Sequence, residues 1–201
     1  QTLRVWPAVE TPDRVSREFR LQRQRKGAPA IESIVLLDRA HLVTVGRRSA
    51  IGWRMPVGKQ ALDTGGEQAE TLAATEEFAL EPQGAAHAIA ASPDNRFLVT
   101  ANEEGTATLW ETASARVAGR LVPRSETQGF RPASIQAVAF ATPHVAGKPY
   151  QLATGDSRGG LRIWQIDAAQ NVQQWQVRWA TDAPVEDISA LAWHDQRLVV
   201  G

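Results

Sequence analysis

The chain of 201 residues is long enough to bury one sizeable hydrophobic core. Its 22 basic and 22 acidic side chains cancel, which argues against a general electrostatic attraction to nucleic acid or to an anionic membrane. It has no Cys, which excludes disulfides, thiol nucleophiles and zinc sites built on Cys. No apolar run approaches the roughly 20 residues of a membrane-spanning helix.

A five-residue pattern that ends in Trp occurs four times along the chain. It reads TLRVW at residues 2–6, SAIGW at 49–53, TATLW at 106–110 and GLRIW at 160–164. Successive tryptophans are therefore 47, 57 and 54 residues apart. A repeat with a period of this length is typical of solenoids, arrays and propellers. Each copy is rich in side chains that fit a pleated sheet, so each is predicted to be a strand.

Two further short strands are predicted before each of the last three copies of this pattern. The resulting groups are residues 31–37, 41–46 and 49–53, then 86–92, 97–101 and 106–110, then 135–141, 151–155 and 160–164. Gly105 and Gly159 precede the last strand of their groups, where a tight hairpin requires a positive φ. A fourth strand can follow each Trp. Residues 172–179 alternate apolar and polar side chains as such a half-buried strand should, and residues 14–26 fit an exposed outer strand.

The two ends of the chain match only parts of this unit. Residues 1–6 fit a third strand, and residues 188–194 and 197–201 fit a first and a second strand. We expect three whole units and two half units, with the boundaries 1–27, 28–83, 84–125, 126–181 and 182–201. Because natural domains rarely end inside a strand pair, we expect a piece of a larger propeller rather than a ring closed by the two halves.

These units resemble the blades of the WD40 family of β-propellers. The best-matching stretch is residues 88–110, which contains the turn Ser92-Pro93-Asp94 and a strand that ends in Trp110. The resemblance implies an all-β fold, a β-propeller of four-stranded antiparallel blades. It also implies a structural role for the Trp that ends each third strand and for a Thr in the second strand, here Trp6, Trp53, Trp110, Trp164, Thr44, Thr100 and Thr154. The Asp that the family places in the following hairpin turn is replaced by Arg48, Glu104 and Arg158.

The sequence predicts no catalytic residue, no metal site and no cofactor. His41, His144 and His194 are predicted beside turns on one face, but packed strands of neighbouring sheets lie about 10 Å apart, too far for shared metal coordination. The adjacent carboxylates at 76–77 and 103–104 are interpreted as solvated turns. No lipase-type, Walker-type or metalloprotease motif occurs.

One face of the predicted propeller collects charged side chains from several blades. The starts of the first strands and the turns between second and third strands should reach this face, and they carry Glu32, Arg47, Arg48, His87, Glu103, Glu104, Gln136, Asp156, Arg158 and Ser189. Equivalent turn positions differ in charge from blade to blade, which packing does not require. We therefore hypothesise that this face recognises a protein partner by charge complementarity.

The functional prediction is a non-catalytic protein-interaction or sensing scaffold. We expect a WD40-like module of a larger, bacterial multidomain protein in the cytoplasm, with a protein partner and the remaining blades or attached domains of the same protein, and without nucleic acid or membrane. Two alternatives stay open. The first is a propeller enzyme with a site in the central channel. The second is nucleic-acid binding through the basic edge at residues 14–26, which carries six basic side chains.

Overall fold

The computed structural model describes residues 2–5, 17–21, 30–56, 72–123, 133–142, 147–167, 176–182, 187–194 and 197–201. Within these ranges the backbone forms strands joined by turns and loops, and no helix occurs. No helix that is long and apolar enough to cross a membrane is found in the described part of the chain. The predicted all-β class is confirmed.

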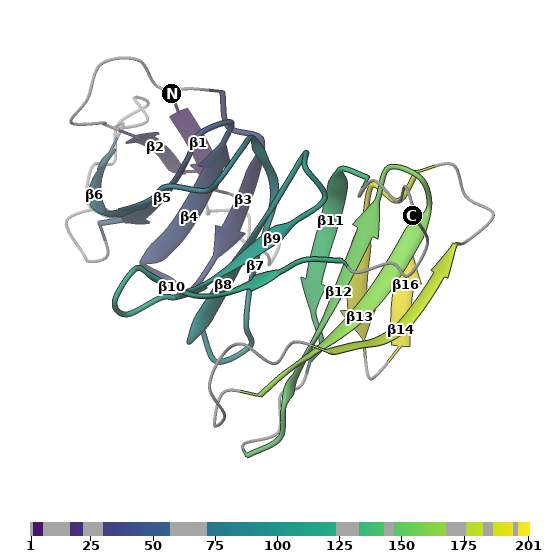
Figure 1. Cartoon of the computed structure of the whole chain (residues 1–201). Helices are drawn as coiled ribbons and strands as arrows, with labels where there is room; N and C mark the ends of the chain where they lie inside the picture. Colours follow the sequence, from purple (N-terminus) through teal and green to yellow (C-terminus); the bar gives the residue numbers. More distant parts are fainter. Residues whose placement is uncertain are drawn as a thin grey trace.

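The strands form three four-stranded antiparallel blades that follow one another along the chain (Figure 1). Blade I consists of β3 (Ser33–Leu36), β4 (His41–Gly46), β5 (Ser49–Arg54) and β6 (Leu72–Leu80). Blade II consists of β7 (Ala86–Ala91), β8 (Phe97–Asn102), β9 (Ala107–Glu111) and β10 (Arg116–Leu121). Blade III consists of β11 (Ile135–Phe140), β12 (Tyr150–Asp156), β13 (Gly160–Ile166) and β14 (Gln176–Asp182).

The C-terminal strands β15 (Leu191–His194) and β16 (Arg197–Val200) form an antiparallel hairpin beside blade III. The first strands of successive sheets contact one another, β3 with β7, β7 with β11, and β11 with β15. This is the arrangement of the inner strands of a propeller, which line its axis while the later strands of each blade extend outward.

The N-terminal strands do not stand as a separate half blade, which differs from the expectation for residues 1–27. β1 (Thr2–Val5) and β2 (Arg17–Leu21) pair antiparallel, and β2 then pairs parallel with β6, Phe19 opposite Leu72. They thus extend the sheet of blade I to six strands. The physical reason is that the outer strand of a blade has an unpaired backbone edge, which another strand can satisfy. Trp6 and the basic residues after Leu21 lie outside the described residues.

The hydrophobic core lies between neighbouring blades as well as within them. Trp110 of blade II is 5% exposed and belongs to a cluster with Val43, Val45 and Leu80 of blade I. Trp164 of blade III is 1% exposed and belongs to a cluster that includes residues of blade II. Each of these two tryptophans therefore joins its own blade to the preceding one.

Each described repeat Trp is also fixed by one buried hydrogen bond. The indole Nε1 donates to Thr Oγ1 of the adjacent second strand at 2.8–2.9 Å, in the pairs Trp53–Thr44, Trp110–Thr100 and Trp164–Thr154. A buried N–H without a partner is costly, so the hydroxyl satisfies a group that burial would otherwise penalise.

The turn between β7 and β8 holds blade II to both of its neighbours. Asn95 adopts a φ of 57° and its Nδ2 donates to the carbonyl oxygen of Leu37 in blade I at 2.6 Å. On the other side the Tyr150 hydroxyl of blade III donates to Asp94 Oδ2 at 2.6 Å. Burial alone would raise the pKa of Asp94, but the hydrogen bonds from Tyr150 and Ser92 outweigh it and hold that pKa below its ordinary value.

Candidate interaction site

The two hairpin turns of blades II and III are organised by a polar residue that ends the second strand. Asn102 Oδ1 accepts the backbone N–H groups of Glu104 and Thr106 at 3.1 and 3.0 Å. Gly105 follows with a φ of 75°, which is the left-handed residue of a three-residue hairpin loop. Side-chain bonds of this kind replace backbone bonds in tight turns.

Asp156 does the same in blade III, and this corrects its predicted place on the interaction face. Its Oδ1 accepts the N–H groups of Arg158 and Gly160 at 3.0 and 2.8 Å, and its Oδ2 accepts Arg162 Nη1 at 2.6 Å. The side chain of Asp156 is 5% exposed and that of Arg162 is 13% exposed. Because its carboxylate is buried and neutralised inside the hairpin, Asp156 is not available to a partner.

The sequence contained a signal for these two residues that its first interpretation missed. Asn102 and Asp156 both stand eight residues before a repeat Trp. They take over the ordering of the turn in a chain that lacks the usual turn Asp two residues later.

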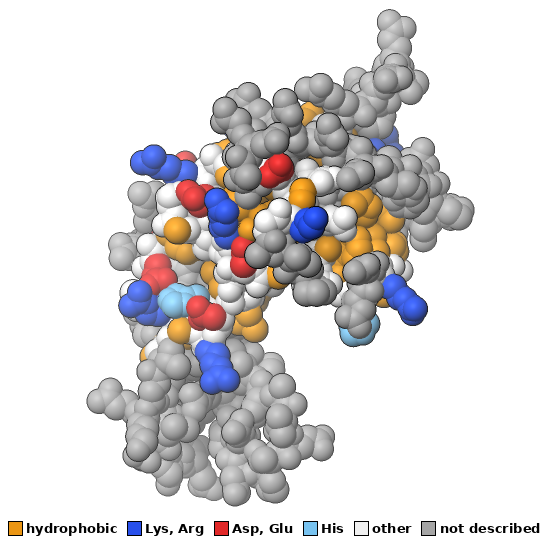
Figure 2. Space-filling model, turned by 90° about the horizontal axis from the view of Figure 1, so that it is seen from below, with side chains coloured by type: hydrophobic (Ala, Val, Ile, Leu, Met, Phe, Trp, Pro, Cys, Tyr) orange, Lys and Arg blue, Asp and Glu red, His pale blue; other side chains and the backbone are white. Residues whose placement is uncertain are grey.

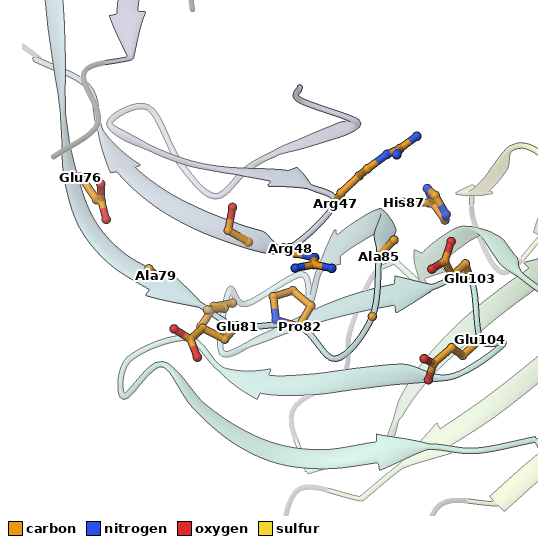
Figure 3. Close-up of a pocket in the computed structure, with 13 residues that line it drawn as sticks. Arg47, Arg48, Glu76, Ala79, Glu81, Pro82, Ala85, His87, Glu103 and Glu104 are labelled. Atoms are coloured by element: carbon orange, nitrogen blue, oxygen red, sulfur yellow. The ribbon is translucent and has the colours of Figure 1, made fainter. Parts of the chain in front are cut away.

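A hollow of about 1130 Å³ lies between the turns of blades I and II (Figure 3). It includes five residues of the predicted face, and the full lining is Arg47, Arg48, Ser49, Glu76, Ala79, Leu80, Glu81, Pro82, Gly84, Ala85, His87, Glu103 and Glu104. The β4–β5 turn supplies the two arginines, the β8–β9 turn supplies Glu103 and Glu104, and β7 supplies His87 near its start.

The remaining predicted face residues lie outside this hollow. Arg47 Nε is 3.8 Å from Glu32 Oε1, so Glu32 sits beside the hollow without lining it. Gln136 is half-buried in β11 and its Nε2 donates to Ser134 Oγ at 3.1 Å. Arg158 is exposed at the β12–β13 turn, and Ser189 is exposed before β15. The structure therefore gathers part of the predicted face into one site.

The connection between β6 and β7 forms part of the lining and is tied to blade II. Asn102 Nδ2 donates to the carbonyl oxygen of Gln83 at 2.7 Å, and the backbone N–H of Glu103 donates to the carbonyl oxygen of Ala85 at 3.1 Å. Gly84 has a φ of 75°, a conformation that side-chain-bearing residues rarely adopt. The same buried Asn102 thus orders both the acidic turn and the connection opposite it.

The lining of the hollow is charged on both sides and carries a net negative charge. It contains two arginines and four glutamates, which sum to −2 with His87 neutral. Glu76 and Glu81 were not predicted here, because the end of β6 and the course of its connection depend on tertiary pairing. Among the described residues no ion pair joins either arginine to any of the four glutamates. These charges are not neutralised within the site.

A second group of charges surrounds His41 at the start of β4. Its Nδ1 is 2.9 Å from the Asp38 carboxylate and its Nε2 is 3.5 Å from Glu77 Oε2, which also pairs with Arg54. His194 ends β15, and His144 lies outside the described residues. The described residues contain no group of three or more His, Cys, Asp or Glu side chains placed to hold a metal ion.

No family model and no curated protein matches the sequence. Among solved structures, the chain is similar to the crystal structure of the RRP9 WD40 repeats and to the structure of U3-55K. Each match has a TM-score of 0.61 and 16% sequence identity, and covers 88% of this chain and 46% of the other. The chain thus spans a little under half the length of each. Strand order, inner-strand contacts and these matches agree, and the chain has a divergent WD40-type β-propeller fold.

Proposed function

We propose that the chain is a non-catalytic protein-interaction module whose partner binds over the hollow between blades I and II. The observation that carries the proposal is the set of charges lining this hollow, which come from separate blades and, among the described residues, form no ion pair with one another. A partner of complementary charge would pair with these groups, which sets the specificity and the rate of association.

The rigid backbone beneath the hollow supports the same function. The bonds from Asn102 and Glu103 hold the connection against the acidic turn, so little backbone has to be ordered when a partner binds. Binding sites that are already ordered lose less conformational entropy on association.

The charge of the hollow favours a protein partner over nucleic acid. Four carboxylates against two arginines would repel a phosphate backbone. Figure 2 shows basic and acidic side chains interspersed on the surface seen from below, with no broad field of one sign among the coloured residues. The basic edge at residues 14–26 lies largely outside the described residues, and nucleic-acid binding there stays an alternative.

Site-specific photo-crosslinking tests the proposal. A photoreactive phenylalanine analogue is placed at Arg48 or at Glu104, both exposed at the hollow, and at Ala113 as a matched control. Ala113 is exposed in the β9–β10 turn, at the opposite end of β9 from the β8–β9 turn. We expect a discrete protein adduct from the two hollow positions and none from the control. Adducts formed equally at Ala113, or adducts to nucleic acid alone, would contradict the proposal.

A further inference from the structure

The walls of the hollow differ in how far their charges are compensated. Arg47 lies near Glu32, which is outside the lining, so part of its charge is already balanced. Arg48 has no ion pair among the described residues. Arg48 and four carboxylates therefore line the same hollow, and two of these carboxylates, Glu103 and Glu104, belong to blade II.

The acidic wall is not required by the turn that carries it. Glu103 and Glu104 occupy the positions held by Ser157 and Arg158 in the equivalent turn of blade III. The side-chain bonds that order the blade II turn are made by Asn102. Both glutamates are exposed, and among the described residues their side chains make no hydrogen bond or ion pair that holds the hairpin.

In the equivalent turn of blade III, the carboxylate is neutralised by an ion pair within the blade. Asp156 is paired with Arg162, whereas the position of Arg162 is occupied in blade II by the neutral Thr108. The position of Asp156 itself is held in blade II by the neutral Asn102, so β9 brings no cation to this turn, and Glu103 and Glu104 line the hollow.

We infer that the segment of the partner that enters the hollow is basic, with a lysine or arginine side chain placed against Glu103 and Glu104 and an acidic residue next to it against Arg48. This inference rests on the proposed function and specifies its ligand. A hollow of about 1130 Å³ is slightly larger than the usual small-molecule site of roughly 300–1,000 Å³, which suits several side chains of a peptide rather than one small molecule. A lysine or arginine would form charge-assisted hydrogen bonds to the two carboxylates.

The test measures fluorescence anisotropy of the full chain with three labelled synthetic peptides of equal length. One contains several Lys and Arg residues and one Glu, the second has Gln in place of each Lys and Arg, and the third has Glu in their place. We expect the basic peptide to bind best and to lose affinity as salt is raised. Equal affinity for the basic and the Gln peptide, or preference for the acidic one, would overturn the inference.

The variant Glu103→Gln with Glu104→Gln tests which residues carry this preference. It should weaken the basic peptide at least about tenfold, the change expected when a hydrogen bond to a charged group is lost. Glu111→Gln, at the other end of β9, is the matched control and should leave binding unchanged. Unchanged binding by the double variant would overturn the inference.

The crosslinking experiment separates this inference from the proposed function. One outcome would be that the Glu103→Gln, Glu104→Gln variant still forms the protein adduct when the photoreactive residue replaces Arg48, while the peptides show no preference for the basic one. In that case the protein-interaction function would stand and the proposal of a basic partner segment would fail. Loss of the adducts at both hollow positions in the otherwise unchanged chain would remove the proposed function itself.

Discussion

Replacing Trp110 by Ala tests whether the repeat tryptophans hold neighbouring blades together. The side chain is 5% exposed and packs in the cluster that joins blade II to Val43, Val45 and Leu80 of blade I. Truncating a buried Trp to Ala removes its transfer free energy and leaves a cavity, at a cost of roughly 3–5 kcal/mol. The Thr100 hydroxyl would also lose the N–H that it accepts at 2.9 Å.

The companion substitution Thr100→Val isolates the polar part of this contact. Valine preserves the shape of the side chain but leaves the indole N–H buried without an acceptor, which costs about 1–3 kcal/mol. The free energy of unfolding should be measured by urea denaturation followed by circular dichroism. Trp110→Ala should lower it by more than Thr100→Val, and the double variant should lower it by less than the sum, because the two residues share one hydrogen bond. An unchanged melting temperature for Trp110→Ala would refute the structural role of the repeat.

Four further predictions follow from individual contacts. Arg48→Glu combined with Arg158→Glu should weaken partner binding in a pull-down with the crosslinked partner and leave the melting temperature unchanged, since both side chains are exposed; undiminished binding would move the site toward residues 14–26. Asp156→Ala should lower the free energy of unfolding by about 3–5 kcal/mol because the buried carboxylate that pairs with Arg162 and accepts two N–H groups of the turn would be lost. An effect as small as that of Glu111→Ala would contradict this. The pKa of Asp94 is lowered in the folded chain, so the Asp94 carboxylate stabilises the fold above the ordinary pKa of 3.8, and this stabilisation is lost as pH falls through the lower folded pKa. The difference in free energy of unfolding between the chain and Asp94→Asn should therefore shrink in acid. A difference that stays constant with pH would contradict this role of Asp94. Val199 is 60% exposed in β16, although Val99 and Ala153 at the equivalent positions of blades II and III are 0% exposed. The chain should therefore self-associate in sedimentation experiments, and Val199→Lys should reduce the self-association. Equal sedimentation of the chain and the variant would argue against an exposed strand edge at β16.

The fold could be predicted from the sequence because its signals are local. The short apolar strands and the turn glycines each depend on neighbouring residues alone, the tryptophans mark their repetition along the chain, and the predicted propeller class is confirmed. Blade I, whose pattern SAIGW at residues 49–53 carries a Gly before the Trp, shows the limit of this reasoning. Gly52 stands where Leu109 and Ile163 stand in the other blades, and the ring of Phe78 on β6 occupies the space that its missing side chain leaves. Nothing near Gly52 in the sequence indicates that compensation.

The candidate site could be predicted only in part, for a related reason. The turn residues Arg48, Glu103 and Glu104 were accessible to sequence reasoning because a hairpin turn exposes its side chains. Glu81 was not, because its place depends on where β6 (Leu72–Leu80) ends, and that is fixed by the pairing of β6 with β5. The burial of Asp156 depends on Arg162 six residues later, and sequence alone does not show that their side chains meet.

Hydrogen–deuterium exchange of the full chain, free and bound to the partner that crosslinking identifies, tests the central claim most directly. The account predicts that binding slows exchange in the β4–β5 turn, the β6–β7 connection and the β8–β9 turn, while the β9–β10 turn at the other end of the blade exchanges as before. Protection that is absent from these three segments and falls instead on residues 14–26 or on the β9–β10 turn would contradict it.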